Sequence, residues 1–343
     1  MGVTDQTMEH ERGGTPSGAD DIRPVFIFSM PRSGSTLTQR VLAAHPQVST
    51  ASEPWILLPL IYATRQAGGY TEYGHRLAAA ALEDYVSGVP GGRDTYRREI
   101  RRFAQRLYRL RSGPAARLFV DKTPRYHLIV DEIFEIFPDA KFVFLWRNLL
   151  AVLASMMETW AGGRWNLYEY EVDLYHGLDN LVKACSRYGS RAYSVRFEDL
   201  VTDPLQSWPG LFGYLGLPFD DGVLDGFRSV ELAGRMGDPT GRFTYRSLST
   251  EPLEKWKHTL GNPIRRAWCR RYLRWVGADR LATMGYDLAE LLEALDGMPL
   301  TGRFLWSDVA NVTWGTAARW IEPWILNEKW EALRHGQRPP VHL

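Results

Sequence analysis

One cation and three hydroxyl groups surround a glycine near the start of the chain: Arg32, Ser33, Gly34, Ser35 and Thr36. A guanidinium stays charged at physiological pH and binds oxyanions through two parallel hydrogen bonds, and hydroxyl groups are further donors. These residue types in one short loop predict a binding site for a phosphate-like anion at residues 29–36.

The segments on either side of this loop would aim it at the anion. Residues 25–28 form an apolar run long enough for one buried strand. After the loop, Leu37, Val41 and Ala44 recur at helical spacing, and Pro46 ends the helix. A strand, a loop and a helix in this order direct free backbone N–H groups and the positive end of the helix toward a phosphate.

The details of the loop argue against the ATP- and GTP-binding type. That type has the pattern G-x-x-x-x-G-K-[ST], with a lysine directly after the second glycine. Here Ser35 follows Gly34, Ser29 occupies the position of the first glycine, and the cation Arg32 precedes Gly34. A P-loop kinase or NTPase is therefore the alternative interpretation and not the first.

Other polar residues follow strands later in the chain. Lys122 comes shortly after the apolar run 118–120, and Arg147 directly follows the run 141–146. Strands alternate with helical segments from residue 23 to about residue 290, which predicts an α/β fold with a parallel sheet and helices on both faces. Side chains that follow parallel strands meet at one edge of such a sheet, where ligands bind.

Two motifs resemble those of the sulfotransferases that use 3′-phosphoadenosine 5′-phosphosulfate (PAPS), especially the bacterial carbohydrate and tyrosylprotein branches. In that family the first loop reads Pro-Lys/Arg-Ser-Gly-Ser/Thr-Thr, and residues 31–36 match it at every position. A second family motif, the lead-in Phe-Pro-x-Ala-Lys, is reproduced by residues 137–141. Arg147 and Ser155 follow at the family's separation, which implies that they bind the 3′-phosphate. The resemblance covers roughly residues 23–286.

The resemblance implies transfer of a sulfuryl group from PAPS to an acceptor hydroxyl, with PAP as the second product and no metal ion. In-line displacement needs a base for the hydroxyl and cations for the leaving phosphate. Glu53 follows the second expected strand, at residues 48–52, where relatives carry the general base. Arg32 and Lys122 are expected to stabilise the transition state.

Both of these catalytic assignments have an alternative. Glu53 precedes Pro54 and an apolar helical run, so its carboxylate could only stabilise a helix N-terminus. The strand that ends at Asp121 could instead present a magnesium ligand, as in P-loop NTPases. The second alternative carries less weight because the first loop lacks the matching lysine.

The resemblance assigns three later positions to the donor nucleotide. Phe197 stands where many relatives have a tyrosine beside the adenine, so the ring is retained without its hydroxyl. Ser249 and Lys255 match a late element that covers the donor phosphates, with Ser247 as the alternative serine.

The composition is that of an ordinary globular protein, with 343 residues, 45% of them hydrophobic, and a formal net charge of +1. The small net charge argues against a nucleic-acid-binding protein. Cys185 and Cys269 form neither a disulfide framework nor a metal-ligand pattern and fit a reducing compartment. No apolar run approaches the ~20 residues that cross a membrane. We therefore expect a cytoplasmic protein with a disordered leader at residues 1–22.

Two segments have more than one interpretation. Residues 93–111 carry eight arginines at helical spacing with apolar residues, which predicts a surface helix or a basic wall that faces an acidic acceptor. Residues 296–343 hold five tryptophans and follow the expected domain at 23–295. We expect this extension to be a helix packed on the domain, with a homodimer contact, an acceptor-groove wall or a peripheral membrane contact as alternatives.

The acceptor is the least determined part. Similarity to bacterial carbohydrate enzymes favours the hydroxyl of a saccharide or another small molecule, and a tyrosine side chain is an alternative. Tyrosylprotein sulfotransferases are membrane-anchored, and we find no anchor in this sequence.

Overall fold

The computed structural model describes residues 22–66, 71, 73–234, 236, 248–321, 330 and 333–334, without the side chains of 316–321. The leader expected at residues 1–22 lies outside this range except for Ile22, which is buried. Ser247, the side chain of Trp320 and Trp324 also lie outside the described part of the chain.

Five strands form a single sheet in the order β2-β3-β1-β4-β5. They are β1 (Arg23–Ser29), β2 (Val48–Thr50), β3 (Leu118–Asp121), β4 (Lys141–Trp146) and β5 (Ala192–Arg196). Every neighbouring pair is parallel, so the carboxyl ends of all five strands lie at one edge. The expected α/β fold with a parallel sheet is confirmed.

Alternate side chains of β1 belong to two separate cores, one on each face of the sheet. Phe26 and Phe28 pack on one face with Phe134 and Phe142, whose rings lie 3.9 Å apart between centroids. The helices of this face are α2 (Leu57–Tyr62), α4 (Gly92–Arg111), α5 (Val130–Ile136), α6 (Leu149–Ala161), α7 (Leu178–Tyr188) and α14 (Pro263–Thr283).

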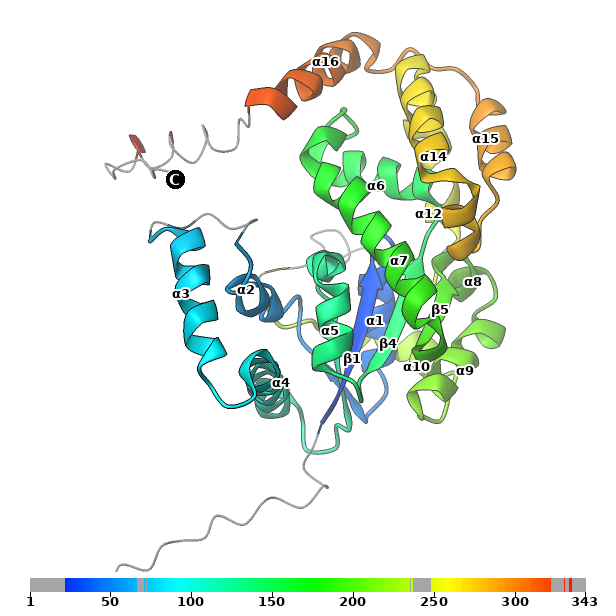
Figure 1. The fold of residues 1–343 in the computed structure, drawn as a ribbon. Helices are drawn as coiled ribbons and strands as arrows, with labels where there is room; N and C mark the ends of the chain where they lie inside the picture. The colour runs from blue at the N-terminus through cyan, green and yellow to red at the C-terminus, as the bar shows by residue number, and fades with distance from the viewer. Residues whose placement is uncertain are drawn as a thin grey trace, which may run out of the picture.

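The strands present smaller aliphatic side chains to the opposite face. Val25 and Ile27 of β1 pack there with Val143 and Leu145 of β4. The helices of this face are α1 (Ser35–Ala43), α8 (Phe197–Thr202), α9 (Pro204–Leu215) and α10 (Val223–Gly226). Helices therefore cover both faces of the sheet, as expected, and Figure 1 shows how they surround it.

The remaining helices are α3 (His75–Ser87), η1 (Pro124–Leu128), η2 (Leu167–Tyr170), the π-helix η3 (Val172–Gly177), η4 (Gly189–Arg191), η5 (Phe227–Ser229), α12 (Glu251–Glu254), α13 (Trp256–Thr259), α15 (Leu288–Asp296) and α16 (Leu305–Ile321). The pattern at residues 251–260 predicts one helix, but the structure has two, α12 and α13. Helix α14 is kinked at Gly277, whose φ of 79° lies outside the helical region.

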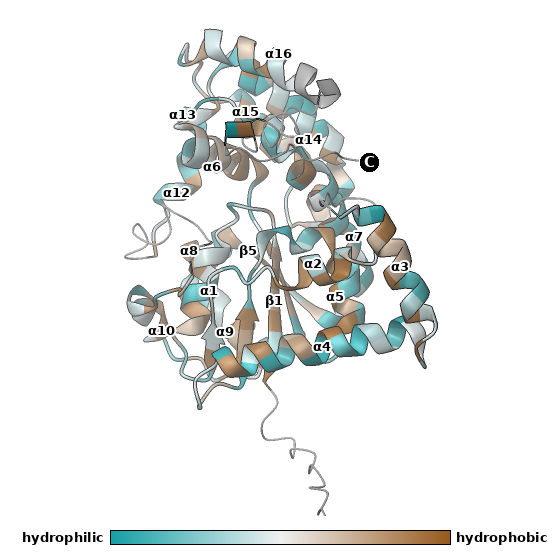
Figure 2. Cartoon of the chain, turned by 90° about the vertical axis from the view of Figure 1, so that its left-hand side faces the viewer, coloured by the Kyte–Doolittle hydropathy of each residue, from teal (hydrophilic) through white to brown (hydrophobic). Residues whose placement is uncertain are grey.

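The arginine-rich segment is the long helix α4, along which hydrophilic and hydrophobic residues alternate (Figure 2). Its inner face buries Ile100, Ala104 and Tyr108. Arg97 pairs with Glu135 of α5 at 2.7 Å. Among the described residues, none from α4 lines the cleft that is described below. The structure therefore favours the surface helix over the basic wall.

The extension begins as part of the folded body. Helix α16 contacts α14 and η2, and its Asp308 is fully buried. Trp306 and Trp314 are instead 84% and 49% exposed. Figure 1 shows α14, α15 and α16 together at the top of the view, away from α4. Within the described ranges, no helix is both long and apolar enough to cross a membrane.

Candidate active site

The loop at residues 29–36 has a strained backbone that few residues tolerate. Gly34 has a φ of 86°, and a Cβ atom there would lie 2.2 Å from the ring of Phe197. Both the backbone angle and this close contact require glycine. Arg32 also adopts a left-handed conformation, with a φ of 68°. Strain of this kind in a non-glycine residue is concentrated at functional sites.

The Arg32 side chain joins the loop to helix α6. Its Nε donates a hydrogen bond to Ser155 Oγ at 3.2 Å. Its guanidinium carbon lies 5.6 Å from the ring centroid of Trp160. Ser155, which we expect at the 3′-phosphate, is thus held beside the first loop by Arg32 itself.

Arg147 also contacts the first loop. Its Nη1 donates to the carbonyl oxygen of Arg32 at 2.8 Å, and its Nη2 donates to that of Pro252 at 3.1 Å. The guanidinium carbon lies 4.9 Å from the centroid of Phe197. Phe197 is fully buried between Arg147 and Gly34. The two segments with family motifs are therefore in direct contact, although they are more than 100 residues apart in sequence.

Glu53 and Lys122 form an ion pair next to this loop. Lys122 Nζ lies 2.7 Å from Glu53 Oε1, and the two side chains are only 2% and 10% exposed. Lys122 Nζ also lies 3.5 Å from Thr36 Oγ1. The indole Nε1 of Trp55 donates to Glu53 Oε2 at 3.1 Å. Each carboxylate oxygen of Glu53 thus has a fixed donor, so its orientation is set.

The pair meets because β2 and β3 are parallel neighbours. Glu53 follows β2 by three residues and Lys122 follows β3 directly, so both emerge at the carboxyl edge of the sheet. The structure favours the view that Glu53 belongs to the site, because its carboxylate contacts a buried lysine.

A buried carboxylate fixes the loop that follows β3. Asp121 accepts hydrogen bonds from Tyr108 Oη at 2.6 Å, Tyr126 Oη at 3.0 Å and Thr123 Oγ1 at 2.9 Å. The backbone N–H of Trp55 donates in turn to Thr123 Oγ1 at 3.2 Å. A carboxylate enclosed by three hydroxyl donors is poorly placed to hold Mg²⁺, so the alternative role for Asp121 loses its basis.

One cleft of about 280 Å³ is lined by Arg32 and residues 34–36 of the first loop together with Glu53, Trp55 and Lys122. Its lining also includes side chains from later elements, among them Arg125, Trp160, Tyr170 and Asp173. The predicted donor-binding residues Ser33, Arg147, Ser155 and Phe197 lie outside this lining. Asp173 accepts from His127 Nε2 at 2.8 Å and from Arg125 at 3.3 Å. Burial acts to raise the pKa of the Asp173 carboxyl, but His127 and Arg125 outweigh it and hold that pKa below its usual value.

The structure does not bring the late predicted residues to the cleft. Lys255 is 61% exposed and pairs with Glu251 at 2.9 Å, and Ser249 Oγ accepts from the backbone N–H of Glu251. Neither lines the cleft. Pro252 lies between them in sequence, and its carbonyl oxygen does accept a hydrogen bond from Arg147. A role of Ser249 and Lys255 at the donor phosphates stays a prediction.

Comparison with known proteins decides which family this is. Residues 24–221, more than half of the chain, match the model of the sulfotransferase family. The chain belongs to the sulfotransferase family. The predicted family resemblance is thereby confirmed. The match ends before the extension, so the expected domain boundary at residue 295 stays a prediction.

Two relatives of this sulfotransferase-family chain illustrate the range of similarity. It is 32% identical over 146 residues to the nodulation protein NoeE of Sinorhizobium fredii, and this alignment covers 41% of this chain and 33% of NoeE. It is 27% identical over 281 residues to protein-tyrosine sulfotransferase 1 of Danio rerio, and this alignment covers 78% of this chain and 73% of that protein. The chain thus spans only a third of NoeE.

Among solved structures, the sulfotransferase domain from the curacin biosynthetic pathway aligns with a TM-score of 0.48 at 22% identity. The alignment covers 69% of this chain and 90% of that domain.

Four lining residues of this sulfotransferase-family site are not found by sequence reasoning. Trp160 and Tyr170 lie on α6 and η2 without a motif, and Asp173 lies in the π-helix η3. Arg125 had the best available signal, because it stands three residues after Lys122 in a segment that follows a strand. Packing alone brings the other three to the cleft.

A substitution of Asp121 is expected to change how the stability of the fold depends on pH. Burial raises the pKa of Asp121 from 3.8 to about 6. Between these two values the folded state holds a proton that the unfolded chain has released. The contribution of Asp121 to the unfolding free energy therefore falls as pH rises, by about 3 kcal/mol in total, and is fully lost above pH 6.

An Asp121→Asn variant stays neutral and escapes this loss. Its unfolding free energy relative to wild type should rise by up to ~3 kcal/mol between pH 4 and pH 7. Urea unfolding at several pH values in this range measures the difference. The same difference at every pH would contradict the assignment of a raised pKa to Asp121.

Proposed function

We propose that this protein transfers a sulfuryl group from PAPS to an acceptor hydroxyl by in-line displacement. The ion pair between Glu53 and Lys122 beside the first loop carries the proposal. It supplies a carboxylate that can take a proton and a cation that can stabilise charge, at one place. Family membership supports the type of reaction.

In the proposed mechanism Glu53 is the general base that removes the proton of the acceptor hydroxyl. Arg32 and Lys122 stabilise the negative charge that develops on the leaving phosphate. Both cations are held in place before reaction, Arg32 by Ser155 and Trp160, and Lys122 by Glu53. Little reorganisation is then needed in the transition state.

The residues of the first loop fit the phosphosulfate end of PAPS. Ser33, Gly34, Ser35 and Thr36 stand at or before the N-terminus of α1, where backbone N–H groups lack helical partners. We propose that Arg147 and Ser155 hold the 3′-phosphate. In the structure Arg147 donates to the carbonyl oxygen of Arg32, and Ser155 Oγ accepts from Arg32 Nε. Binding of the nucleotide would replace these hydrogen bonds or add to them.

For the acceptor we propose a saccharide or another small ring compound with a hydroxyl group. Support comes from the other residues that line the cleft: Trp55, Trp160 and Tyr170 are aromatic, and Arg125 and Asp173 carry polar groups. Aromatic rings can stack on a ring-shaped ligand while the polar pair orients its hydroxyls.

Transfer of label from sulfur-labelled PAPS tests the proposal. The acceptor panel would contain neutral oligosaccharides, small phenols and alcohols, and a tyrosine-containing peptide. We expect label on a saccharide or a small hydroxyl compound. Label on the peptide alone would contradict the acceptor class, and PAP binding without transfer to any acceptor would contradict the reaction. The predicted cytoplasmic location, independence of metal ions, homodimer and membrane contact remain predictions.

A further inference from the structure

The acceptor side of the cleft is an aromatic wall formed by Trp160 and Tyr170. Their rings stack with centroids 4.8 Å apart, and Trp160 also faces Arg32 of the first loop. Both residues lie in the segment 158–170, Tyr170 at its end and Trp160 close to its start. Gly162 and Gly163 have φ values of 56° and 82°, so helix α6 stops here and the chain turns away. The backbone N–H of Gly163 donates to the carbonyl oxygen of Met157 at 3.0 Å and closes the turn, and further contacts come from other elements.

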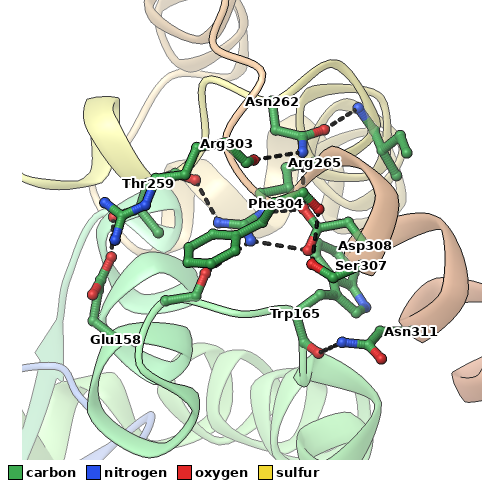
Figure 3. A network of polar contacts seen from close by, with 12 residues as sticks. Glu158, Trp165, Thr259, Asn262, Arg265, Arg303, Phe304, Ser307, Asp308 and Asn311 are labelled. Carbon is green, nitrogen blue, oxygen red and sulfur yellow. Dashed lines mark hydrogen bonds and ion pairs between the residues drawn. The ribbon is translucent and has the colours of Figure 1, made fainter.

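One buried guanidinium supplies the central contact. Arg265 Nη2 donates to the carbonyl oxygen of Gly163 at 2.8 Å, and Nη1 donates to that of Thr259 at 2.8 Å. The same side chain binds both carboxylate oxygens of Asp308 in helix α16, at 2.6 and 3.0 Å. Asn262 donates to Asp308 as well, at 3.0 Å. Figure 3 shows this network, which links α14 and α16 to the turn.

Three further contacts hold the segment along its length. Asn311 Nδ2 donates to the carbonyl oxygen of Trp165 at 3.1 Å. Thr259 Oγ1 donates to Glu158 at 2.8 Å (Figure 3). Gly315 packs so closely that a Cβ atom there would lie 2.8 Å from Tyr168 Cβ. The segment is thus held at residues 158, 163, 165 and 168, mainly by residues of the C-terminal part of the chain.

The residues that hold the wall lie outside the region that matches the family, which ends at residue 221. The wall itself lies inside that region. We infer that helix α16 positions Trp160 and Tyr170 and thereby sets which acceptors the cleft admits. Its Asp308 binds Arg265 of α14, and Arg265 in turn binds the turn at Gly163. This inference rests on the proposed function. The start of the extension then positions the acceptor side of the cleft, and it reaches the nucleotide side only through the contact of Trp160 with Arg32.

The test perturbs α16 without weakening the helix. Gly315→Ala removes a poor helix former but places a methyl group against Tyr168. Gly213→Ala in helix α9 is the matched control, because a Cβ atom there meets nothing within 4 Å. Asn311→Ala removes the bond to Trp165. The control is Thr313→Ala, because the exposed Thr313 donates to the carbonyl oxygen of Val309 in its own helix. Asp308→Asn is more disruptive and is not required.

Two measurements separate the outcomes. Hydrogen–deuterium exchange should rise in residues 158–170 of both test variants and change much less in the first loop. The KM for the acceptor should rise roughly tenfold, with the stoichiometry of PAP binding unchanged. The loss of PAP affinity should be smaller than the change in KM, because Ser155 and Arg147 still contact Arg32 when Trp160 shifts. A network that only stabilises the fold would lower the amount of folded enzyme and leave KM unchanged, which would overturn the inference.

Failure of the proposed function has a different signature. In that case the unmodified protein transfers no sulfuryl group, and no KM for the acceptor can be measured. The exchange measurement then decides the positioning claim by itself. Unchanged exchange at residues 158–170, or an equal change in the two controls, would refute it.

Discussion

Replacement of Glu53 by glutamine is expected to lower turnover by roughly 10²- to 10⁴-fold. Glutamine has the same shape but cannot accept a proton at neutral pH. It also places an amide donor toward Lys122 or Trp55, both of which donate to the carboxylate in the structure. Affinity for PAP should change little, because the first loop and Arg147 do not depend on this carboxylate for their contacts.

Steady-state transfer from PAPS and titration with PAP measure the two quantities. Glu83→Gln is the matched control, since Glu83 is also bound to a cation, Arg93, but on the surface of α3. Turnover of the Glu53→Gln variant within a few-fold of wild type would remove Glu53 from the role of base.

The second large effect is expected at Lys122. A Lys122→Met variant keeps most of the side-chain volume and removes the charge, so the transition state loses one stabilising cation. Loss of a preorganised charged donor of this kind lowers turnover by about 10²- to 10³-fold. The variant also leaves Glu53 without its partner, which is expected to lower the unfolding free energy because both side chains are largely buried.

A double variant separates catalysis from structure. If Glu53 and Lys122 act on one step, the double variant Glu53→Gln, Lys122→Met should lose no more activity than the worse single variant. Lys183→Met is the control, because Lys183 pairs with Asp179 on the surface, where it is 68% exposed. Additive losses in the double variant would contradict the coupled roles.

The sequence was sufficient for the parts of the site that depend on local pattern. The run of β1, the first loop and α1 are contiguous, so spacing alone predicted the strand, the turn and the helix. The same holds for β4 followed by Arg147. The contact between Arg147 and the carbonyl oxygen of Arg32 was not predictable, because it depends on β1 and β4 being neighbours in the sheet.

Residues that meet only through packing were beyond a sequence-based prediction. Glu53 and Lys122 were assigned separate roles, and their pairing follows from strand order. The sequence leaves a magnesium-binding role open for Asp121, because it does not show that the hydroxyl groups of Tyr108 and Tyr126 reach this carboxylate from other elements. The aromatic wall was missed for the same reason, since Arg265 and Asp308 hold it from far along the chain.

The central claim is that this site transfers a sulfuryl group from PAPS and does not use Mg·ATP. The most direct measurement gives the unmodified protein sulfur-labelled PAPS in one reaction and γ-labelled ATP with Mg²⁺ in another, each with the acceptor panel. We predict that sulfur label reaches a hydroxyl acceptor and that no label leaves ATP. Phosphoryl label on the acceptor, with none from PAPS, would contradict it.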